Sequence, residues 1–217
     1  FLKIKIMKNL IKPSSPIRLQ KIFEVGFIGI LSLTFFSSCQ KNLEEHPKSL
    51  AVETFYNTAA DVEAGVNAIY PPLRSTDIMG SYIPELEPYV DYGYGRGSLE
   101  VLNDFAGLDA THTSKVALAW GAFYLSIRNA NLVIKNAPNG KEISQADIVR
   151  YVAEAKFLRA FDYFHLVRNW GGVPIRTEAN LTEINVKKSP VDSVYALIVS
   201  DWKYAETNLP EKQSPAG

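Results

Sequence analysis

The chain has 217 residues with 23 basic and 23 acidic side chains, which suits one globular domain, alone or with short appendages. Charge is unevenly spread, because residues 1–38 hold six Lys or Arg and one acid, leaving 17 basic and 22 acidic residues in the remainder. This mildly acidic body excludes the basic surface by which proteins bind nucleic acid. A single cysteine, Cys39, excludes an internal disulfide framework and a cysteine metal site.

Residues 1–38 have the pattern of a targeting segment. A basic stretch is followed by an apolar run over 25–36, which as a helix would span roughly 18 Å and would be too short to cross a membrane. The sequence Phe36-Ser-Ser-Cys39 then resembles a bacterial lipobox. We therefore expect a lipoprotein signal peptide over 1–38, a lipidated Cys39 and a polar tether over 39–52. A plain secretory signal and a retained anchor are the alternatives.

The stretch 55–74 predicts the first helix of the body. Thr58 followed by Asp61 has the spacing of a capping box. Apolar residues then recur at three- and four-residue steps and predict one buried face, made of Val62, Val66, Ile69 and Leu73. The two prolines at 71–72 cannot continue a helical hydrogen-bond ladder, so we expect the helix to end or kink near Tyr70.

The stretch 115–137 predicts a second helix from its apolar spacing, with a buried face of Trp120, Phe123, Tyr124, Ile127, Asn131 and Ile134. Asn131 is a weak helix former, so we expect its amide to bond a neighbouring backbone group and not a ligand. A third helix begins after Ser144, with Asp147 as capping partner, and ends at Gly171. The short connection between the two is typical of an antiparallel helical hairpin.

The third helix is apolar on two sides, which predicts that it packs between neighbours. One side holds Val152, Ala155, Leu158, Phe161 and Leu166, and the other holds Phe157, Ala160, Phe164 and Val167. Its charged residues suggest acid–base chemistry at first sight, but Glu154 and His165 are eleven residues, roughly 16 Å, apart. We therefore assign no catalytic residue and expect structural pairs along the helix, from Glu154, Arg159, Asp162 and Arg168.

A polar connector over 175–188 leads to a predicted fourth helix. Ser189 is its expected N-cap and Pro190 its first residue. Its apolar spacing predicts a buried face of Val194, Tyr195, Ile198, Trp202, Ala205 and Leu209. Together the four stretches predict an all-α fold of helical hairpins.

Residues 75–113 have many glycines and prolines and no sustained period, which predicts a long irregular loop insertion. The loop carries four tyrosines with an arginine close behind: Tyr82, Tyr89, Tyr92, Tyr94 and Arg96. Tyrosine rings stack on flat apolar faces while their hydroxyls stay hydrated, which suits sugar binding. The alternative is that these rings hold the loop against the body. His46 and His112 have no partner at a ligand spacing, so we expect no metal site and no cofactor.

Five blocks in chain order resemble the SusD/RagB family of outer-membrane glycan-binding lipoproteins. The strongest lies in the third helix, from Glu154-Ala-Lys-Phe-Leu-Arg-Ala160 to Trp170-Gly-Gly-Val-Pro174. The other four are the lipobox with 43–47, the capping region at 53–70, the motif at 120–131 and the last helix at 194–210. Together they cover nearly all of residues 36–210.

The resemblance implies TPR-like helical hairpins that contact a TonB-dependent, SusC-like transporter, with glycan bound by irregular segments. It implies a lipid anchor on Cys39 at the outer membrane, facing the cell exterior, and no enzymatic activity. Residues 53–217 would be the N-terminal helical domain alone, because family members continue well beyond it, so we expect a truncated chain. Two alternatives stay open: a helical scaffold that binds only protein, and a non-functional fragment.

Overall fold

The structure is a computed structural model that describes residues 55–103 and 113–212, with the side chains of 113–115 excepted. Its helices are α3 (Ala59–Asn67), α4 (Tyr70–Leu73), α5 (Ile83–Leu86), α6 (Thr113–Asn136), α7 (Gln145–Trp170) and α8 (Val191–Asn208). A π-helical segment η3 (Asp77–Tyr82) and 3-10 turns η4 (Glu87–Tyr89), η5 (Gly97–Leu102) and η6 (Ala137–Asn139) complete it. None of the helices in these ranges is long and apolar enough to span a bilayer. The predicted signal peptide, Cys39 and tether lie outside the described residues.

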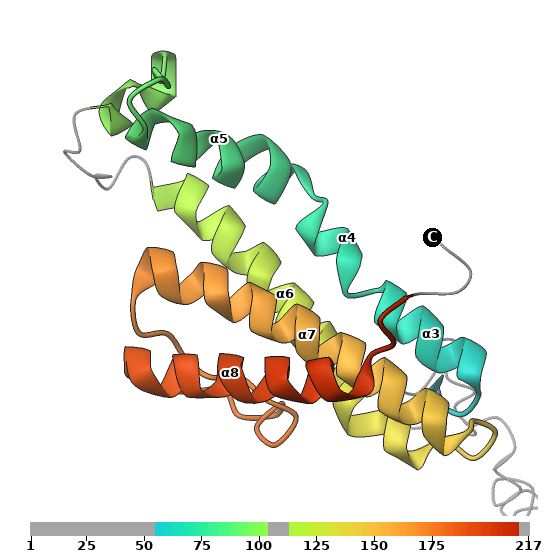
Figure 1. The fold of residues 1–217 in the computed structure, drawn as a ribbon. Helices are drawn as coiled ribbons and strands as arrows, with labels where there is room; N and C mark the ends of the chain where they lie inside the picture. The colour runs from blue at the N-terminus through green and yellow to red at the C-terminus, as the bar shows by residue number, and fades with distance from the viewer. Residues whose placement is uncertain (1–54, 104–112, 213–217) are drawn as a thin grey trace, which may run out of the picture. The chain divides into compact units, whose positions relative to one another are not determined.

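The helices pack around an antiparallel hairpin formed by α6 and α7. α8 packs along α7, while α3, α4 and η3 lie along α6 (Figure 1). Two apolar clusters fill the spaces between them, one with Val62, Val133 and Tyr151 and the other with Phe123, Tyr163 and Leu166. The described residues form no strand, and this arrangement confirms the predicted all-α fold of helical hairpins.

The first predicted helix begins with the expected capping box and is divided near its prolines. The Asp61 amide donates to Thr58 Oγ1 at 3.2 Å, and the Thr58 amide donates to Asp61 Oδ2 at 2.9 Å. α3 ends at Asn67, and α4 begins at Tyr70 with the prolines 71–72 in its first turn, where a missing N–H costs little. The expected break is confirmed, and Val62, Val66 and Ile69 are buried as predicted.

The prediction of a long irregular loop over 75–113 is wrong for most of the described part of that segment. η3, α5 and η4 follow one another without a break from Asp77 to Tyr89, and η5 adds further turns. Pro84 and Pro88 occupy the first turns of α5 and η4, where proline's fixed φ favours a helical start. The sequence prediction treats these prolines as breakers, whereas each begins a turn. Residues 90–96 remain irregular.

α7 begins and ends as predicted, but two of its apolar side chains are not buried. Ser144 Oγ accepts from the Asp147 amide at 3.1 Å, and Gly171 ends the helix with a φ of 70°. Phe157 and Phe161 are 44% and 37% exposed, which contradicts their predicted burial. They line a groove of about 330 Å³ between α7 and the α4–α5 segment, which no described element fills. Helical spacing identifies apolar residues but does not show whether a neighbour covers them.

α8 differs from its prediction by one residue at its start. Pro190, whose backbone is extended with a ψ of 153°, is the N-cap, and no side chain caps the helix. Ser189 lies one residue further out, and its amide donates to Val173 O at 3.0 Å. Val194, Ile198 and Ala205 are buried as predicted, and Trp202 is partly buried. Tyr195 is 38% exposed, so its predicted burial is wrong.

Arg159 forms the predicted internal ion pair of α7. Its Nε and Nη2 donate to Asp201 at 2.7 and 2.9 Å, and its Nη1 donates to Asn131 Oδ1 and to Glu178 Oε2, each at 2.6 Å. Asn131 Nδ2 donates to Arg176 O at 3.0 Å, which confirms the structural role expected of this amide. α6, α7, α8 and the connector therefore meet at one buried guanidinium.

The other three residues predicted to form pairs along α7, Glu154, Asp162 and Arg168, form no ion pair within the described part of the chain. Glu154 accepts a hydrogen bond from the Tyr70 hydroxyl at 2.6 Å, and Arg168 lies over the Phe164 ring at 5.0 Å. Asp162 is fully buried beside Ser126, and neither of its carboxylate oxygens has a partner among the described residues. Burial raises its pKa well above the ordinary value, against a smaller opposing effect of Ser126.

Two glycines with open space around them predict opposite effects of the same substitution. Gly171 has φ 70° and ψ −133°, a conformation that side chains rarely adopt, so Gly171→Ala should destabilise the protein by about 1–3 kcal/mol. Gly121 lies inside α6, where alanine is the better helix former, so Gly121→Ala should stabilise it by about 0.5–1 kcal/mol. Urea unfolding of each variant measures its change in unfolding free energy. Equal changes in the two variants would contradict the argument from backbone conformation.

Candidate functional site

Tyr82, the first of the predicted ligand residues, is buried. It is 5% exposed, and its ring packs edge-on against Phe123 at 5.3 Å. Its hydroxyl accepts a hydrogen bond from Asn169 Nδ2 at 2.7 Å and lies 3.1 Å from His165 Nδ1. Burial raises the pKa of this hydroxyl, so it stays protonated. Tyr82 therefore anchors η3 to α7, which is the structural role that the sequence left open for these tyrosines.

Tyr92, Tyr94 and Arg96 lie on the surface. The two tyrosines are 87% and 71% exposed, and Arg96 is exposed beside them. Tyr89 is 37% exposed and lines a small pocket of about 150 Å³ with Glu85 and Trp170. The structure therefore brings three of the five predicted residues to one exposed segment, which we call the tyrosine loop (residues 90–96).

The shape of the tyrosine loop is fixed by its backbone. Asn103 Oδ1 accepts from the Gly95 amide at 2.7 Å, and Asn103 Nδ2 donates to Gly95 O at 2.9 Å. A Cβ at Gly93 would lie 2.2 Å from Glu87 O, and one at Gly95 would lie 2.4 Å from Leu99 O, so only glycine fits at either position. The two tyrosine rings are therefore presented on a defined turn.

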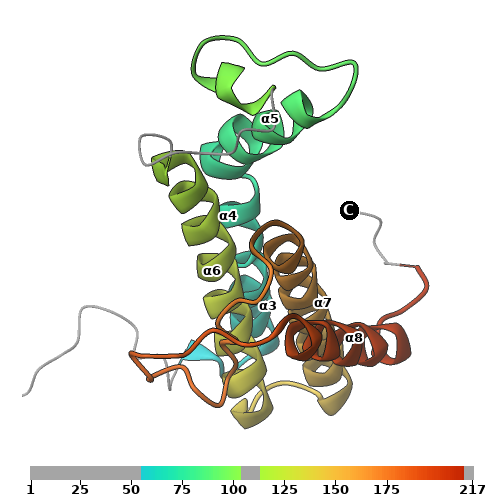
Figure 2. The same ribbon diagram turned by 90° about the vertical axis from the view of Figure 1, so that its left-hand side faces the viewer.

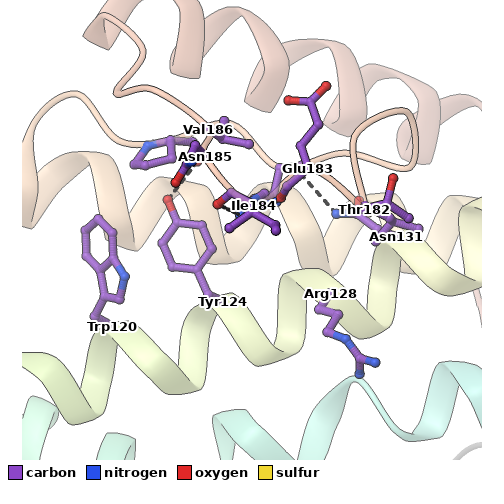
Figure 3. Close-up of a pocket in the computed structure, with 12 residues that line it drawn as sticks. Trp120, Tyr124, Arg128, Asn131, Thr182, Glu183, Ile184, Asn185 and Val186 are labelled. Carbon is purple, nitrogen blue, oxygen red and sulfur yellow. Dashed lines mark hydrogen bonds between the residues drawn. The ribbon is translucent and has the colours of Figure 1, made fainter.

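A larger pocket, of about 610 Å³, lies on another part of α6 (Figure 3). Its floor includes Trp120 and Tyr124, one turn apart on α6, and its opposite wall is the connector segment 181–186. The Tyr124 hydroxyl donates to Pro174 O at 2.7 Å. Burial raises the pKa of this hydroxyl, which keeps it a donor.

The wall of this pocket is held by Arg176. The Arg176 amide donates to the Tyr163 hydroxyl at 2.6 Å, and that hydroxyl donates to Arg176 O at 2.9 Å. The guanidinium donates to the backbone carbonyl oxygens of Glu183 and, at 3.2 Å, of Ile184. The connector was expected only to be polar. Its role as a pocket wall depends on Trp120 and Tyr124, more than fifty residues earlier in α6, so no local pattern shows it.

The described ranges were also searched for side chains that could bind a metal ion. No cluster of three or more His, Cys, Asp or Glu side chains lies close enough to hold a metal ion among residues 55–103 and 113–212. His165 is enclosed by aromatic rings, with Phe161 at 4.5 Å and Phe123 at 5.6 Å, and burial and Arg168 lower its pKa.

The helical hairpins place the chain in the class of all-α proteins built from packed helix pairs. Within that class, the profile of a SusD-like family described as starch-binding and associating with the outer membrane matches residues 42–215. The chain therefore belongs to the SusD-like family, and the resemblance noted in the sequence is confirmed.

Individual relatives agree with this assignment. SusD-like protein P25 of Formosa agariphila is 32% identical over 187 residues, which are 79% of this chain and 35% of the relative. The structure of a SusD homolog from Bacteroides thetaiotaomicron matches with a TM-score of 0.63 and 26% identity, over 73% of this chain and 32% of that one. A laminarin-binding SusD-like protein matches with a TM-score of 0.61 and 26% identity, over 74% and 36%. The chain thus spans about a third of the length of the curated relatives it matches.

Proposed function

We propose that the chain is part of a cell-surface lipoprotein that binds glycan and passes it to a TonB-dependent, SusC-like transporter in the outer membrane. Membership of the SusD-like family carries this proposal, and a similar structure is that of a laminarin-binding protein. Lipid attached to Cys39 would hold the protein at the membrane, facing the cell exterior. The protein would bind and deliver its ligand without chemical change, as a carbohydrate-binding and non-enzymatic protein.

The tyrosine loop is the proposed glycan surface. Tyr92 and Tyr94 expose most of their rings on a turn that Asn103 and two glycines fix. Because the turn is already formed, a sugar ring that stacks on these side chains would not have to order the loop first. Arg96, exposed on the same segment, can donate to sugar hydroxyls.

Replacing both tyrosines should weaken glycan binding. We expect the Tyr92→Ala/Tyr94→Ala variant of the full chain to bind at least about tenfold more weakly, because apolar contact worth about 1.5–3 kcal/mol per buried ring is lost. Calorimetric titration with laminarin and with soluble starch measures this. Tyr195→Ala, which removes an exposed tyrosine from α8, is the matched control. Unchanged affinity for a glycan that the wild type binds would overturn the assignment of the tyrosine loop.

The apolar groove favours the alternative of a protein-binding scaffold. Tyr70, Met79, Ile83, Phe157 and Phe161 are all exposed along it, and it offers almost no polar group to a sugar. If neither glycan binds, and a Phe157→Gln/Phe161→Gln variant fails to co-purify with a transporter barrel that the wild type retains, the scaffold function would replace the proposed one.

A further inference from the structure

The pocket between α6 and the connector has the rigidity of a binding site. Pro174 and Lys188 form a backbone bridge at the two ends of the connector, and Asn180 Nδ2 donates to Ile175 O at 3.0 Å within it. Arg176 ties the far side of the loop to its base through the carbonyl oxygens of Glu183 and Ile184. A ligand entering this pocket would meet a wall that is already formed, so little ordering would oppose binding.

Two aromatic rings line the floor of the pocket. The centroids of Trp120 and Tyr124 are 4.8 Å apart, and the Trp120 ring is held edge-on by Trp170 at 5.5 Å. The bond from Tyr124 to Pro174 O fixes the second ring (Figure 3). Fixed aromatic rings provide apolar surface for the C–H faces of a ring-shaped ligand.

The rim of the pocket, formed by the connector, carries polar side chains that have no hydrogen-bond partner in the described ranges. The side chains of Thr182, Glu183 and Asn185 line the pocket and form no hydrogen bond within the described ranges. Of the two arginines at the pocket, Arg176 donates to backbone carbonyls, and Arg128 points away from the connector (Figure 3). Arg128 also lines the pocket, but the rim formed by the connector presents a hydroxyl, a carboxylate and an amide, which suit a neutral ligand rich in hydroxyl groups.

We infer that this pocket is a second subsite for a neutral saccharide, one that takes one or two pyranose rings between Trp120, Tyr124 and the rim of Thr182 and Asn185. Its volume of about 610 Å³ lies in the usual range for small-ligand sites. It shares no residue with the tyrosine loop: its lining comes from α6 and from the segment 174–186, whereas residues 90–96 lie between η4 and η5, in the part of the chain coloured green in Figure 2. The inference rests on the proposed glycan-binding function and extends it to a second surface.

A nuclear magnetic resonance titration of the ¹⁵N-labelled full chain with methyl β-D-glucoside tests the subsite. We expect the Trp120 indole N–H and the amides of 182–185 to shift. We expect Thr182→Ala/Asn185→Ala to weaken this binding about tenfold, as the loss of two hydrogen bonds predicts. Lys187→Ala, on the same connector but outside the pocket lining, should leave the binding unchanged. The three positions are exposed, so the variants should keep the wild-type unfolding midpoint.

The outcomes separate this inference from the proposed function. Shifts confined to residues 89–96, or no shifts at all, would overturn the second subsite, while laminarin or starch binding that depends on Tyr92 would still support the proposed function. Pocket shifts that persist at full strength in Thr182→Ala/Asn185→Ala would also overturn it. Pocket shifts lost in that variant, with unaltered binding in Tyr92→Ala/Tyr94→Ala, would support the subsite and contradict the tyrosine loop.

Discussion

Replacing Asp201 with asparagine is expected to lower the free energy of unfolding by about 3–5 kcal/mol, a large share of the total stability of a domain of this size. Asp201 and Arg159 are each 1% exposed, and the carboxylate accepts two hydrogen bonds from the guanidinium. Asparagine fills the same space but removes the charge that balances the buried guanidinium. Urea denaturation followed by circular dichroism measures the loss.

Glu178 provides the matched control, because it contacts the same guanidinium from the surface. Its oxygen lies 2.6 Å from Arg159 Nη1, but its side chain is 38% exposed. Water screens this pair, so Glu178→Gln should cost less than about 1 kcal/mol. Equal losses in Asp201→Asn and Glu178→Gln would show that burial does not set the strength of this network.

A double replacement separates the charge from the packing. Arg159→Met with Asp201→Leu removes both charges and keeps apolar bulk, so it should be less destabilising than Asp201→Asn alone. A double variant that is less stable than the single one would mean that the other contacts of the pair dominate, namely the hydrogen bonds of Arg159 to Asn131 and Glu178 and the 3.2 Å pair of Asp201 with Lys156.

Local signals predicted the helices well, because capping depends on residues within one turn. Thr58 with Asp61 and Ser144 with Asp147 form the expected contacts over three residues, and Gly171 adopts the positive φ that ends α7. The start of α8 differs from its prediction by one residue, because Pro190 has an extended backbone and is itself the N-cap.

Contacts between residues far apart in the sequence cannot be predicted from signals within one helical turn. Arg159 meets Asp201 across 42 residues, and Asn131 meets Arg176 across 45, so no local pattern shows these pairs. Phe157 and Phe161 have the spacing of a buried face, but their exposure depends on which elements lie over them. The SusD-like resemblance supplied what periodicity could not, namely that the separate helices belong to one fold.

The candidate surfaces were partly visible in the sequence. A cluster of tyrosines marked the segment that the structure exposes at Tyr92 and Tyr94, but composition could not tell them from Tyr82, which packs against Phe123. The pocket at Trp120 and Tyr124 was hidden, because these residues have the spacing of a buried face and the connector wall carries no motif. Whether a ring is covered or exposed is decided by its neighbours in space.

The contribution of Asp162 to the stability of the protein should fall with rising pH. This carboxyl is fully buried without a partner among the described residues, and burial raises its pKa in the folded state. In the unfolded chain it ionises near its ordinary pKa of 3.8. Below that pH both states are protonated and its contribution is fully present. As pH rises toward the folded pKa, the unfolded state alone releases a proton, so stability is lost by about 1.4 kcal/mol per pH unit.

Asp162→Asn removes this titration while keeping the shape of the side chain. We expect the melting temperature of the variant relative to the wild type to rise between pH 4 and pH 8, and to level off once the pH exceeds the folded pKa of Asp162. Asp61 and Asp147, whose pKa values are lowered by capping hydrogen bonds, act in the opposite direction but are present in both proteins and cancel in the difference. Differential scanning calorimetry of both proteins at several pH values measures this difference in melting temperature. A difference independent of pH would mean that Asp162 is ionised in the folded protein and that a counter-charge or water solvates it.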